Sequence, residues 1–288
     1  MKYAHRPQKV PGHVDVAIAS FAARDGIPPG DLALAAELET AGCGVAHFAW
    51  SDAAVDWTEF GAVVVRSCWD YHLRPAEFLA WVGGLESRGI AVVNSPAVIR
   101  WNADKRYLAG FGAAIPETEW IAEGASRDIA SLCRERGWQS AVVKPLISAS
   151  AHRTELGHEG TAEGPAMVQE FVPEIQDGEW SLMYFGGAFS HGVLKVPTAG
   201  DFRVQKEYGG SAIAAAPPGA VITFGDSVMA RLPEPVAFAR VDIVVSRRRG
   251  PLLMELEVIE PELFLDYSPA AATLAARAVL QYLKENRR

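Results

Sequence analysis

The stretch that decides the fold is FARVDIVVSRRRGPLLMELEVIEPELFL, residues 238–265. Two apolar runs, VDIVV and PLLMELEVI, flank the tight basic turn SRRRG and predict a β-hairpin. Because side chains alternate along a strand, Glu255 and Glu257 share one face of the second strand, and Asp242 lies on the first. These carboxylates would repel one another unless a cation lay among them. An oxygen-only ligand set favours Mg²⁺ carried by a phosphate ligand.

The same pattern has a plainer interpretation. The two glutamates would form the solvated face of an edge strand, with the apolar side chains turned toward a core. One-sided wet strands are common, so the hairpin alone leaves both interpretations open. The rest of the chain decides between them.

Length and composition limit the classes of protein. The 288 residues can form one large domain or two to three small ones, and 49% hydrophobic content is ample for a core. A net charge of -8 without a basic patch argues against nucleic acid as a partner. Cys43, Cys68 and Cys133 suit neither a disulfide framework nor a zinc site, which indicates a reducing compartment. MKYAHRPQKVPGH lacks the apolar core of a signal peptide, so we expect a cytoplasmic protein without a membrane segment.

Strands and helices alternate from residue 14 to residue 94. VDVAIAS, VAHFAW, AVVVRS and IAVVN are predicted strands, and DLALAAELETAG, opened by Asp31, and PAEFLAWVGGLESRG are predicted helices. This alternation predicts a parallel α/β layer, which binds ligands beyond the carboxyl ends of its strands. The turn RSCWDYH leaves one such end. We therefore expect contacts with a small polar substrate from Arg66, Ser67, Trp69, Asp70 and Tyr71. Packing under a loop is the alternative for Trp69 and Tyr71.

Two lysines occupy unusual positions. Asn102 is a plausible N-cap for a helix that carries Lys105 in its first turn, where the helix dipole prefers an anion. Lys105 makes sense there if an anion is delivered to it. Lys144 ends the apolar run of SAVVKPLI, either as an edge residue with its charge in water or as a phosphate ligand.

A polar loop and an extended segment follow. SASAHRTELGHEG, residues 148–160, has the composition of a mobile flap, and AMVQEFVPEI is a predicted strand. GEWSLMYFGGAFSHGVLKV predicts two strands around the turn at Gly186 and Gly187. An extended segment between two lobes can offer backbone groups to a flat heterocycle. Glu170, Glu174 and Glu179 would then lie near a base and its ribose, and each is otherwise a surface carboxylate.

DFRVQKEYGG is a cationic segment in an acidic protein. Arg203 and Lys206 precede the paired glycines Gly209 and Gly210. Two cations and a flexible turn can close over phosphoryl groups, or they can form an ordinary exposed strand. The final stretch, SPAAATLAARAVLQYLKENRR, predicts an amphipathic helix to which we assign no chemistry.

The order of these features resembles the ATP-grasp superfamily over nearly the whole chain. NADK, VVKP, MVQEFV, GEWS, DFRVQ, RVD and MELE follow in the superfamily's order. The resemblance implies an α/β ATP-grasp fold with an N-terminal parallel α/β (pre-ATP-grasp) domain. We expect the substrate-side domain at residues 1–98. The small lobe with its lead-in helix is expected at 99–172, and the large lobe with the metal site at 173–288.

The resemblance also implies a ligand set of ATP and one or two Mg²⁺ ions, with Mn²⁺ as a substitute. Lys105 and Lys144 would bind phosphates. The adenine and ribose would be held by Gln169, Glu170, Phe171, Val172 and Glu179, and Lys206 would add to the nucleotide site. The metal ligands would be Asp242, Glu255 and Glu257. Catalysis would fall to Lys144 and Arg203, and Arg203 would bind substrate together with Gly209 and Gly210.

Two positions depart from the superfamily's pattern. Many members carry asparagine where this chain has Glu257, and the flap lacks the usual glycines. Within the superfamily, RSCWDYHLRPAEFLAW, DFRVQKEYGG and MELEVIEPELFL most resemble the group that contains the D-cycloserine-forming cyclo-ligase. Glutathione-synthetase-like ligases resemble the chain more distantly.

The implied activity is an ATP-dependent ligation. A substrate carboxylate becomes an acyl phosphate and is joined to an amine-type nucleophile of a small amino-acid-like substrate. The two groups belong to one molecule if O-ureido-D-serine is closed to D-cycloserine, and to two if a dipeptide or modified peptide is made. Two rival classes are a nucleotide-binding regulator without turnover and a metal hydrolase without a nucleotide. The second rival would leave Lys105, Lys144 and the hinge without a role. The sequence leaves the oligomeric state open, a homodimer included.

Overall fold

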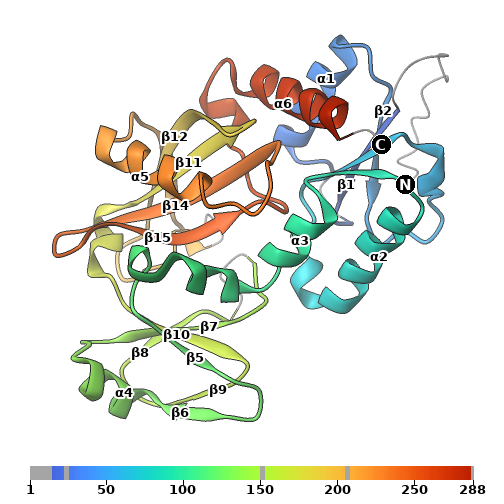
Figure 1. Ribbon diagram of the computed structural model, residues 1–288. Coiled ribbons are helices and arrows are strands. Elements are labelled where there is room, and N and C mark those ends of the chain that lie inside the picture. The colour runs from blue at the N-terminus through green and yellow to red at the C-terminus, as the bar shows by residue number, and fades with distance from the viewer. Residues whose placement is uncertain (1–14, 23–25, 150–152, 205–207, 287–288) are drawn as a thin grey trace.

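The computed structural model describes residues 15–22, 26–149, 153–204 and 208–286, and its N-terminal part is the expected parallel α/β layer (Figure 1). The sheet has the order β2-β1-β3-β4. Its strands are β1 (Val16–Ser20), β2 (Val45–Ala49), β3 (Ala62–Val65) and β4 (Ala91–Val93). Between them lie α1 (Pro29–Thr40), η1 (Trp57–Glu59), η2 (Tyr71–Leu73) and α2 (Pro75–Ser87). Val16 and Ile18 pack with α1, whereas Ala17 and Ala19 pack with α2, so both faces of the sheet are buried.

Helix α1 begins before the expected start at Asp31. Pro28 is its N-cap and Pro29 its first residue. Proline suits this position because the first N–H groups of a helix have no intrahelical partner. Asp31 is therefore not a cap, and its fully buried side chain faces the inside of the domain.

The segment after the first sheet also corrects an expectation. Asn102 does not cap the helix that carries Lys105, because it is the last residue of α3 (Pro96–Asn102). Its buried amide donates to Leu256 O at 2.8 Å and accepts from Val258 N at 3.1 Å. Asp104 is the cap of the following 3-10 helix, η3 (Lys105–Ala114). The expected cap instead ties this segment to the last residues of β15, Gly250–Glu257, and the residue after it.

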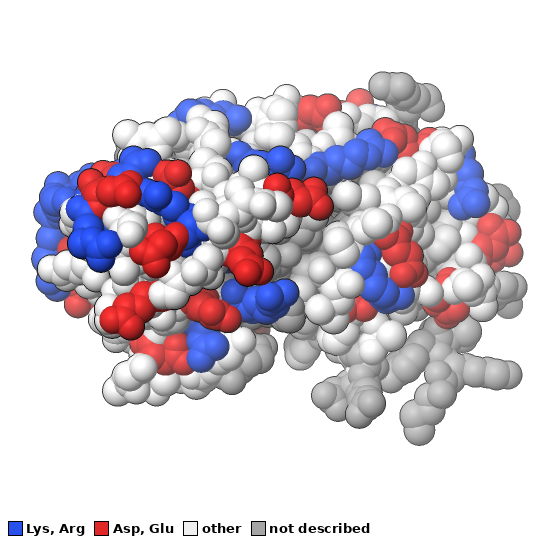
Figure 2. All heavy atoms as spheres, turned by 90° about the horizontal axis from the view of Figure 1, so that it is seen from below, with Lys and Arg blue, Asp and Glu red and all other residues white. Residues whose placement is uncertain are grey.

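A smaller antiparallel sheet follows, which we call the lid sheet. Its order is β5-β10-β7-β8, formed by β5 (Thr118–Ile121), β7 (Ala141–Pro145), β8 (Glu155–Gly157) and β10 (Ala166–Glu170). Helix α4 (Ile129–Arg136) and the pair β6 (Ser126–Asp128) and β9 (Thr161–Glu163) cover it (Figure 1). On the face seen from below, acidic and basic side chains are interspersed rather than gathered by sign (Figure 2). Ion pairs such as Arg136–Glu119 account for part of this mixing.

The third sheet has five antiparallel strands in the order β13-β12-β11-β14-β15. They are β11 (Glu179–Phe185), β12 (Ala188–Val196), β13 (Ser211–Ala214), β14 (Phe238–Ser246) and β15 (Gly250–Glu257). The expected hairpin is thus β14–β15. One face packs on α5 (Gly219–Met229) and η3 through an apolar core. The other face lies beside η4 (Pro173–Asp177), and it carries the polar residues of the site.

The C-terminal helix joins the two larger layers. Helix α6 (Ala271–Glu285), preceded by η6 (Leu265–Tyr267), lies between the parallel sheet and the five-stranded sheet (Figure 1). Its buried face, which includes Ala275 and Val279, shares one core with Val16 and Phe185. Among the described helices, none has the length and apolar character needed to cross a membrane.

Candidate active site

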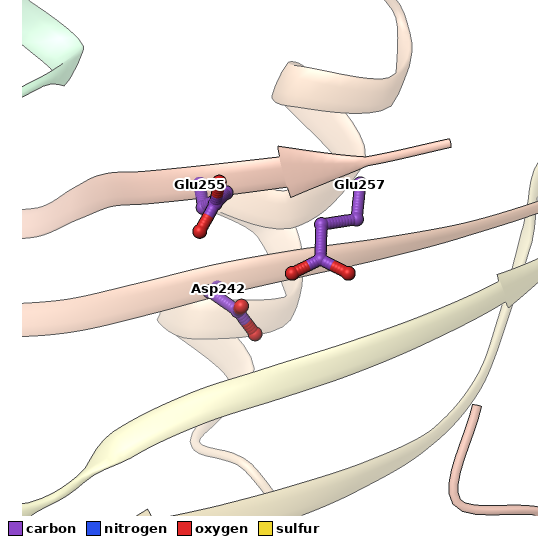
Figure 3. A group of neighbouring side chains, drawn as sticks. All are labelled: Asp242, Glu255 and Glu257. Carbon is purple, nitrogen blue, oxygen red and sulfur yellow. The ribbon is translucent and has the colours of Figure 1, made fainter. Parts of the chain in front are cut away.

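Three carboxylates meet on one face of the β14–β15 hairpin (Figure 3). Asp242 extends from β14, and Glu255 and Glu257 extend from β15. One oxygen from each lies within 4.8 Å of the others. Strand β15 is indeed a sheet edge, as the plainer interpretation required, but the glutamate side chains are only 35% and 24% exposed. Each contacts a cation, so this is not a solvated strand face.

Arg240 lies among these carboxylates. Its guanidinium contacts Asp242 at 3.0 Å and also forms an ion pair with Glu257. Ser181 Oγ donates to Asp242 at 2.5 Å from the neighbouring strand. Burial alone would raise the pKa of Asp242, but Arg240 and Lys195 outweigh it and hold the pKa at about 2. Asp242 is therefore ionised at neutral pH.

Glu257 behaves in the opposite way. Burial raises its pKa to about 7, although Arg240 opposes the shift, and the nearby charges of Glu255 and Asp242 add to it. The protonated form of Glu257 is therefore favoured in the folded protein, mainly because burial removes water from its carboxylate. Glu257, where many members of the superfamily carry asparagine, is thus a titratable group with a raised pKa.

A second ion-pair group adjoins the first. Lys195 of β12 contacts Glu179 at 2.5 Å and Asp242 at 3.2 Å. Glu179 and Lys195 are directly opposite one another on β11 and β12. Burial raises the pKa of Glu179 in spite of Lys195, and the Asp242 charge adds to this. Glu179, the predicted ribose ligand, is therefore buried and shares Lys195 with Asp242.

The two predicted phosphate lysines reach the same place from different elements. Lys105 begins η3 and forms an ion pair with Glu255. Burial would lower the pKa of Lys105, but the Glu255 charge more than offsets this, so the pKa is raised. Lys144 lies on β7 and donates to Gln169 Oε1 at 3.1 Å. Burial lowers its pKa, because no carboxylate is close enough to offset it fully.

The predicted hinge forms the wall next to these lysines. Gln169 is buried and also donates to Thr118 Oγ1 at 3.2 Å. Phe171 packs edge-on against Phe202, with ring centroids 6.1 Å apart, and Val172 is buried beside them. Glu170 faces the pocket and is held by two arginines of the hairpin turn. Glu174 lies away from the pocket and accepts from Arg247 N at 2.9 Å.

One pocket gathers most of the predicted nucleotide and metal residues. Its predicted members are Lys105, Lys144, Gln169, Glu170, Phe171, Val172, Glu179, Arg203, Asp242 and Glu255. Sequence reasoning missed its apolar members, which include Val142, Ile175, Phe202, Val204 and Met254. The pocket thus has a charged part, which includes Lys105, Asp242 and Glu255, and an apolar part, in which Phe171, Val172, Ile175, Phe202, Val204 and Met254 pack together. That division suits a molecule with an anionic end and a flat, weakly polar end.

Two cations of the site were also missed. Arg240 could have been found, because it stands two residues before Asp242 and so shares its strand face. Lys195 carried no such signal. An irregularity between β11 and β12 shifts their register, and only that shift places Lys195 opposite Glu179.

The segment DFRVQKEYGG lies only partly within the described residues. Arg203 lines the pocket, where Asp201 binds its guanidinium at 2.7 Å and Tyr208 lies under it at 3.6 Å. Lys206 lies outside the described residues, as do residues 150–152 of the predicted flap. Gly209 and Gly210 do not line the pocket, although Gly209 has a φ of +84° that favours glycine.

Arg66 and Ser67, which we expected to contact substrate, bind partners inside the N-terminal layer instead. Both side chains are buried. Arg66 Nε donates to Asp31 at 3.1 Å and its Nη1 to Pro261 O at 3.0 Å, while Ser67 Oγ donates to Asp31 at 2.7 Å. Strand β3 does end here as expected, but helix α1 delivers Asp31 to the same point and satisfies both groups.

The rest of the RSCWDYH turn is divided. Tyr71 is buried against Phe78, so it packs under the loop as the alternative predicted. Trp69 is half-buried, and its Nε1 donates to Glu260 O at 3.1 Å. Asp70 accepts from Trp50 Nε1 at 2.7 Å and contacts Arg74 at 3.2 Å. Arg74 therefore already balances the charge of Asp70.

Comparisons with known proteins extend these observations. A family model described as the N-terminal domain of D-cycloserine synthetase DcsG matches residues 16–94. The cycloserine biosynthesis protein DcsG of Streptomyces lavendulae is 30% identical over 271 residues, which cover 82% of this chain and 87% of that protein. The crystal structure of D-cycloserine synthetase DcsG has a TM-score of 0.78 at 24% identity and covers 93% of this chain and 99% of that chain. D-alanine–D-alanine ligase from Bacillus anthracis complexed with ATP has a TM-score of 0.65 at 12% identity, covering 95% and 98%.

Proposed function

Because the chain belongs to the DcsG family of ATP-grasp ligases, we propose that it closes a small amino-acid derivative into a ring at the expense of ATP. It is an ATP-dependent ligase with an ATP-grasp fold. The observation that carries the proposal is the divided pocket, whose charged part includes Asp242 and Glu255 of the three clustered carboxylates and whose apolar part includes Phe171 and Val172 of the hinge.

The nucleotide would lie along this division. Phe171, Val172 and Met254 would contact the base, with backbone groups of the hinge beside it, and Glu179 would hold the ribose. Lys105 and Lys144 would bind phosphate oxygens, each through a charge-assisted contact. Lys144 supports this role best, because its ammonium group is partly buried and donates a hydrogen bond to the neutral amide of Gln169. Lys206 remains proposed for the nucleotide from the sequence alone.

The carboxylate group fits Mg²⁺, with Mn²⁺ as a substitute. Asp242, Glu255 and Glu257 supply only oxygen donors, and these lie close enough together to share one or two ions. When bound, Mg²⁺ would supply charge neutralisation across the phosphate oxygens. Arg240 and Lys105 would then give up their carboxylates and turn to the anionic ligand.

The reaction asks the protein for alignment and electrostatic stabilisation. A carboxylate oxygen of the substrate attacks the γ-phosphorus, the acyl phosphate forms and ADP leaves. A nitrogen of the same substrate then attacks the acyl carbon, and phosphate leaves. Arg240 and Lys195 would stabilise the developing negative charge from the floor of the site. Arg203 would do so from the opposite wall, and removing one such donor costs roughly a hundred- to a thousandfold in rate.

For the substrate side of the site, we keep the residues of the RSCWDYH turn whose side chains are not buried. Trp69 and Asp70, with Arg203 and the glycines at 209 and 210, stay in the proposed set, whereas Arg66, Ser67 and Tyr71 leave it. We also retain the domain boundaries at residues 98 and 172, a cytoplasmic location and a homodimer as proposals.

Phosphate release from ATP tests the function directly. The purified protein is incubated with Mg²⁺, ATP and a panel of serine- and alanine-derived compounds that includes O-ureido-D-serine. Release should be stimulated by a single compound that carries both a carboxylate and a nitrogen nucleophile, and mass spectrometry should find a cyclic product. A requirement for two different amino compounds would favour the dipeptide-type ligation instead. ATP binding without stimulation by any compound would contradict the proposal.

A further inference from the structure

The chain crosses between the large sheet and the lid sheet at two places. It enters the lid sheet through residues 113–117, which are the last two residues of η3 and the link to β5, and leaves through residues 170–172, which are the last residue of β10 and the link to η4. The two crossings lie side by side, because Glu170 N donates to Glu117 O at 2.8 Å. Any movement of the lid sheet against the large sheet must therefore bend these two segments together.

A single side chain of the basic turn binds both crossings. Arg249 Nη2 donates to Ala113 O at 3.0 Å and to Ile115 O at 2.7 Å in the entering segment. Its Nη1 lies 3.4 Å from Glu170 Oε2 in the leaving segment. The arginine and glutamate side chains are 21% and 16% exposed, so solvent screens this contact less than at an open surface.

The two preceding arginines do less. Arg248 also reaches Glu170, at 2.8 Å, but its side chain is mostly exposed. Arg247 contacts Asp177 at 2.7 Å, and this side chain is 77% exposed. Of the three arginines in the turn, only Arg249 contacts the entering segment in the part of the chain that the structure describes. Arg247 is thus a matched control in the same turn.

We propose that Arg249 is a positioning residue that fixes the hinge of the lid sheet and so sets the geometry of the nucleotide-binding wall. The proposal rests on the proposed function, because that function makes residues 169–172 the contact for the base. Arg249 stands at the tip of the same hairpin whose other end carries Glu255 and Glu257. One rigid hairpin would thereby hold the metal ligands and the hinge in register. Binding to a wall that is already ordered loses less conformational entropy.

The test compares Arg249→Met, Arg249→Lys and Arg247→Met with the parent. Calorimetry measures the Kd of ATP with Mg²⁺, steady-state kinetics separates KM for ATP from kcat, and hydrogen exchange follows the amides of residues 113–117 and 170–172. Arg249→Met should raise Kd and KM for ATP about tenfold, as expected for the loss of charge-assisted contacts, with kcat at saturating ATP changed much less. Its exchange should accelerate in both crossings. Arg249→Lys should give values of Kd, KM and exchange rate between those of the parent and of Arg249→Met, because an ammonium group cannot span both segments. Arg247→Met should resemble the parent.

Each outcome decides a different point. Unchanged exchange in Arg249→Met, or the same change in Arg247→Met, would overturn the hinge role. Faster exchange with unchanged ATP affinity would overturn the link to the nucleotide wall. A parent protein that binds no ATP would refute the proposed function and that link together, whereas the exchange result would still judge the hinge role.

Discussion

Two buried ion-pair groups in this molecule differ in what they leave unsatisfied. In the N-terminal layer, the Arg66 and Asp31 side chains are 2% and 1% exposed, and Ser67 and a backbone carbonyl complete their hydrogen bonds. In the pocket, Arg240 divides itself between Asp242 and Glu257. The first group is closed and neutral. The second crowds carboxylates around shared cations and leaves the pKa of Glu257 near 7.

This difference separates a structural ion pair from a binding site. A buried pair with all its hydrogen bonds made has nothing to offer a ligand, and removing one partner strands the other. Carboxylates that share cations can exchange them for a metal ion, and at Glu257 the shared Arg240 does not prevent a raised pKa. We therefore expect charge removal to affect stability in the first group and activity in the second.

Glu255→Gln should produce the largest loss of activity. The variant retains the shape and a hydrogen-bond acceptor for Lys105, but it removes a metal-ligand charge. We expect turnover to fall by at least about a thousandfold, since metal-ion stabilisation supplies several kcal/mol. The midpoint of thermal unfolding without metal should stay close to that of the parent. Normal turnover would reduce the hairpin to an ordinary edge strand.

Asp31→Ala should have the opposite profile. It leaves Arg66 buried without a counter-charge, which costs about 3–5 kcal/mol of unfolding free energy in such cases. Urea denaturation measures the loss, and KM for ATP in the folded fraction should be unchanged. The double variant Asp31→Leu, Arg66→Met serves as the control, since apolar replacement of a whole buried pair is often neutral. A single variant as stable as the parent would contradict the structural role.

Lys144→Met should weaken ATP binding without a large change in stability. Methionine keeps much of the apolar stem and removes the charge that we assign to a phosphate. A charge-assisted contact corresponds to about ten- to a hundredfold in Kd, measured by calorimetry with Mg²⁺. Lys284→Met, in the exposed last turn of α6, is the control. Equal affinity in both variants would return Lys144 to the role of an edge residue.

The smallest expected effect is a change in the unfolding free energy with pH, caused by Glu257. Its pKa rises on folding from 4.5 to about 7, so the folded state favours the protonated form. The resulting stabilisation is complete below the unfolded pKa and is lost as pH rises through 7. Relative to Glu257→Gln, the metal-free parent should therefore lose on the order of 1 kcal/mol between pH 5 and pH 8, measured by urea denaturation. Mg²⁺ should reduce this loss, and equal slopes for both proteins would contradict the shift.

Local patterns in the sequence predicted the hairpin and the close approach of its three carboxylates. Alternation determines which side chains share a strand face, and a short basic turn determines which strands pair. Contacts between distant segments could not be predicted in this way. Asp31 binds Arg66, 35 residues further along the chain, and Asn102 binds a strand more than 150 residues further along the chain.

A shift in the register between β11 and β12 explains why Lys195 was not predicted as a residue of the site. A regular ladder from the Gly186–Gly187 turn would place Leu194 opposite Glu179, whereas the observed shift places Lys195 there. Such a shift depends on packing across the whole sheet, and no local residue pattern in β12 announces it. The apolar side of the pocket was missed for a similar reason, because it gathers residues from four separate segments of the chain.

The bulge in the β14–β15 hairpin allows the hairpin to lose one residue without changing which side chains face each other near the carboxylates. Asp242 pairs with Glu255 and Ile243 with Leu253, so Met254 is an extra residue without a partner across the ladder. Loss of one residue on the turn side can be absorbed by flattening this bulge, and Asp242 would still face Glu255. Loss of Leu256 could not be compensated by a bulge, and it would turn Glu257 toward the apolar core. Length variation among relatives of this chain should therefore be tolerated before Met254 and excluded between Glu255 and Glu257.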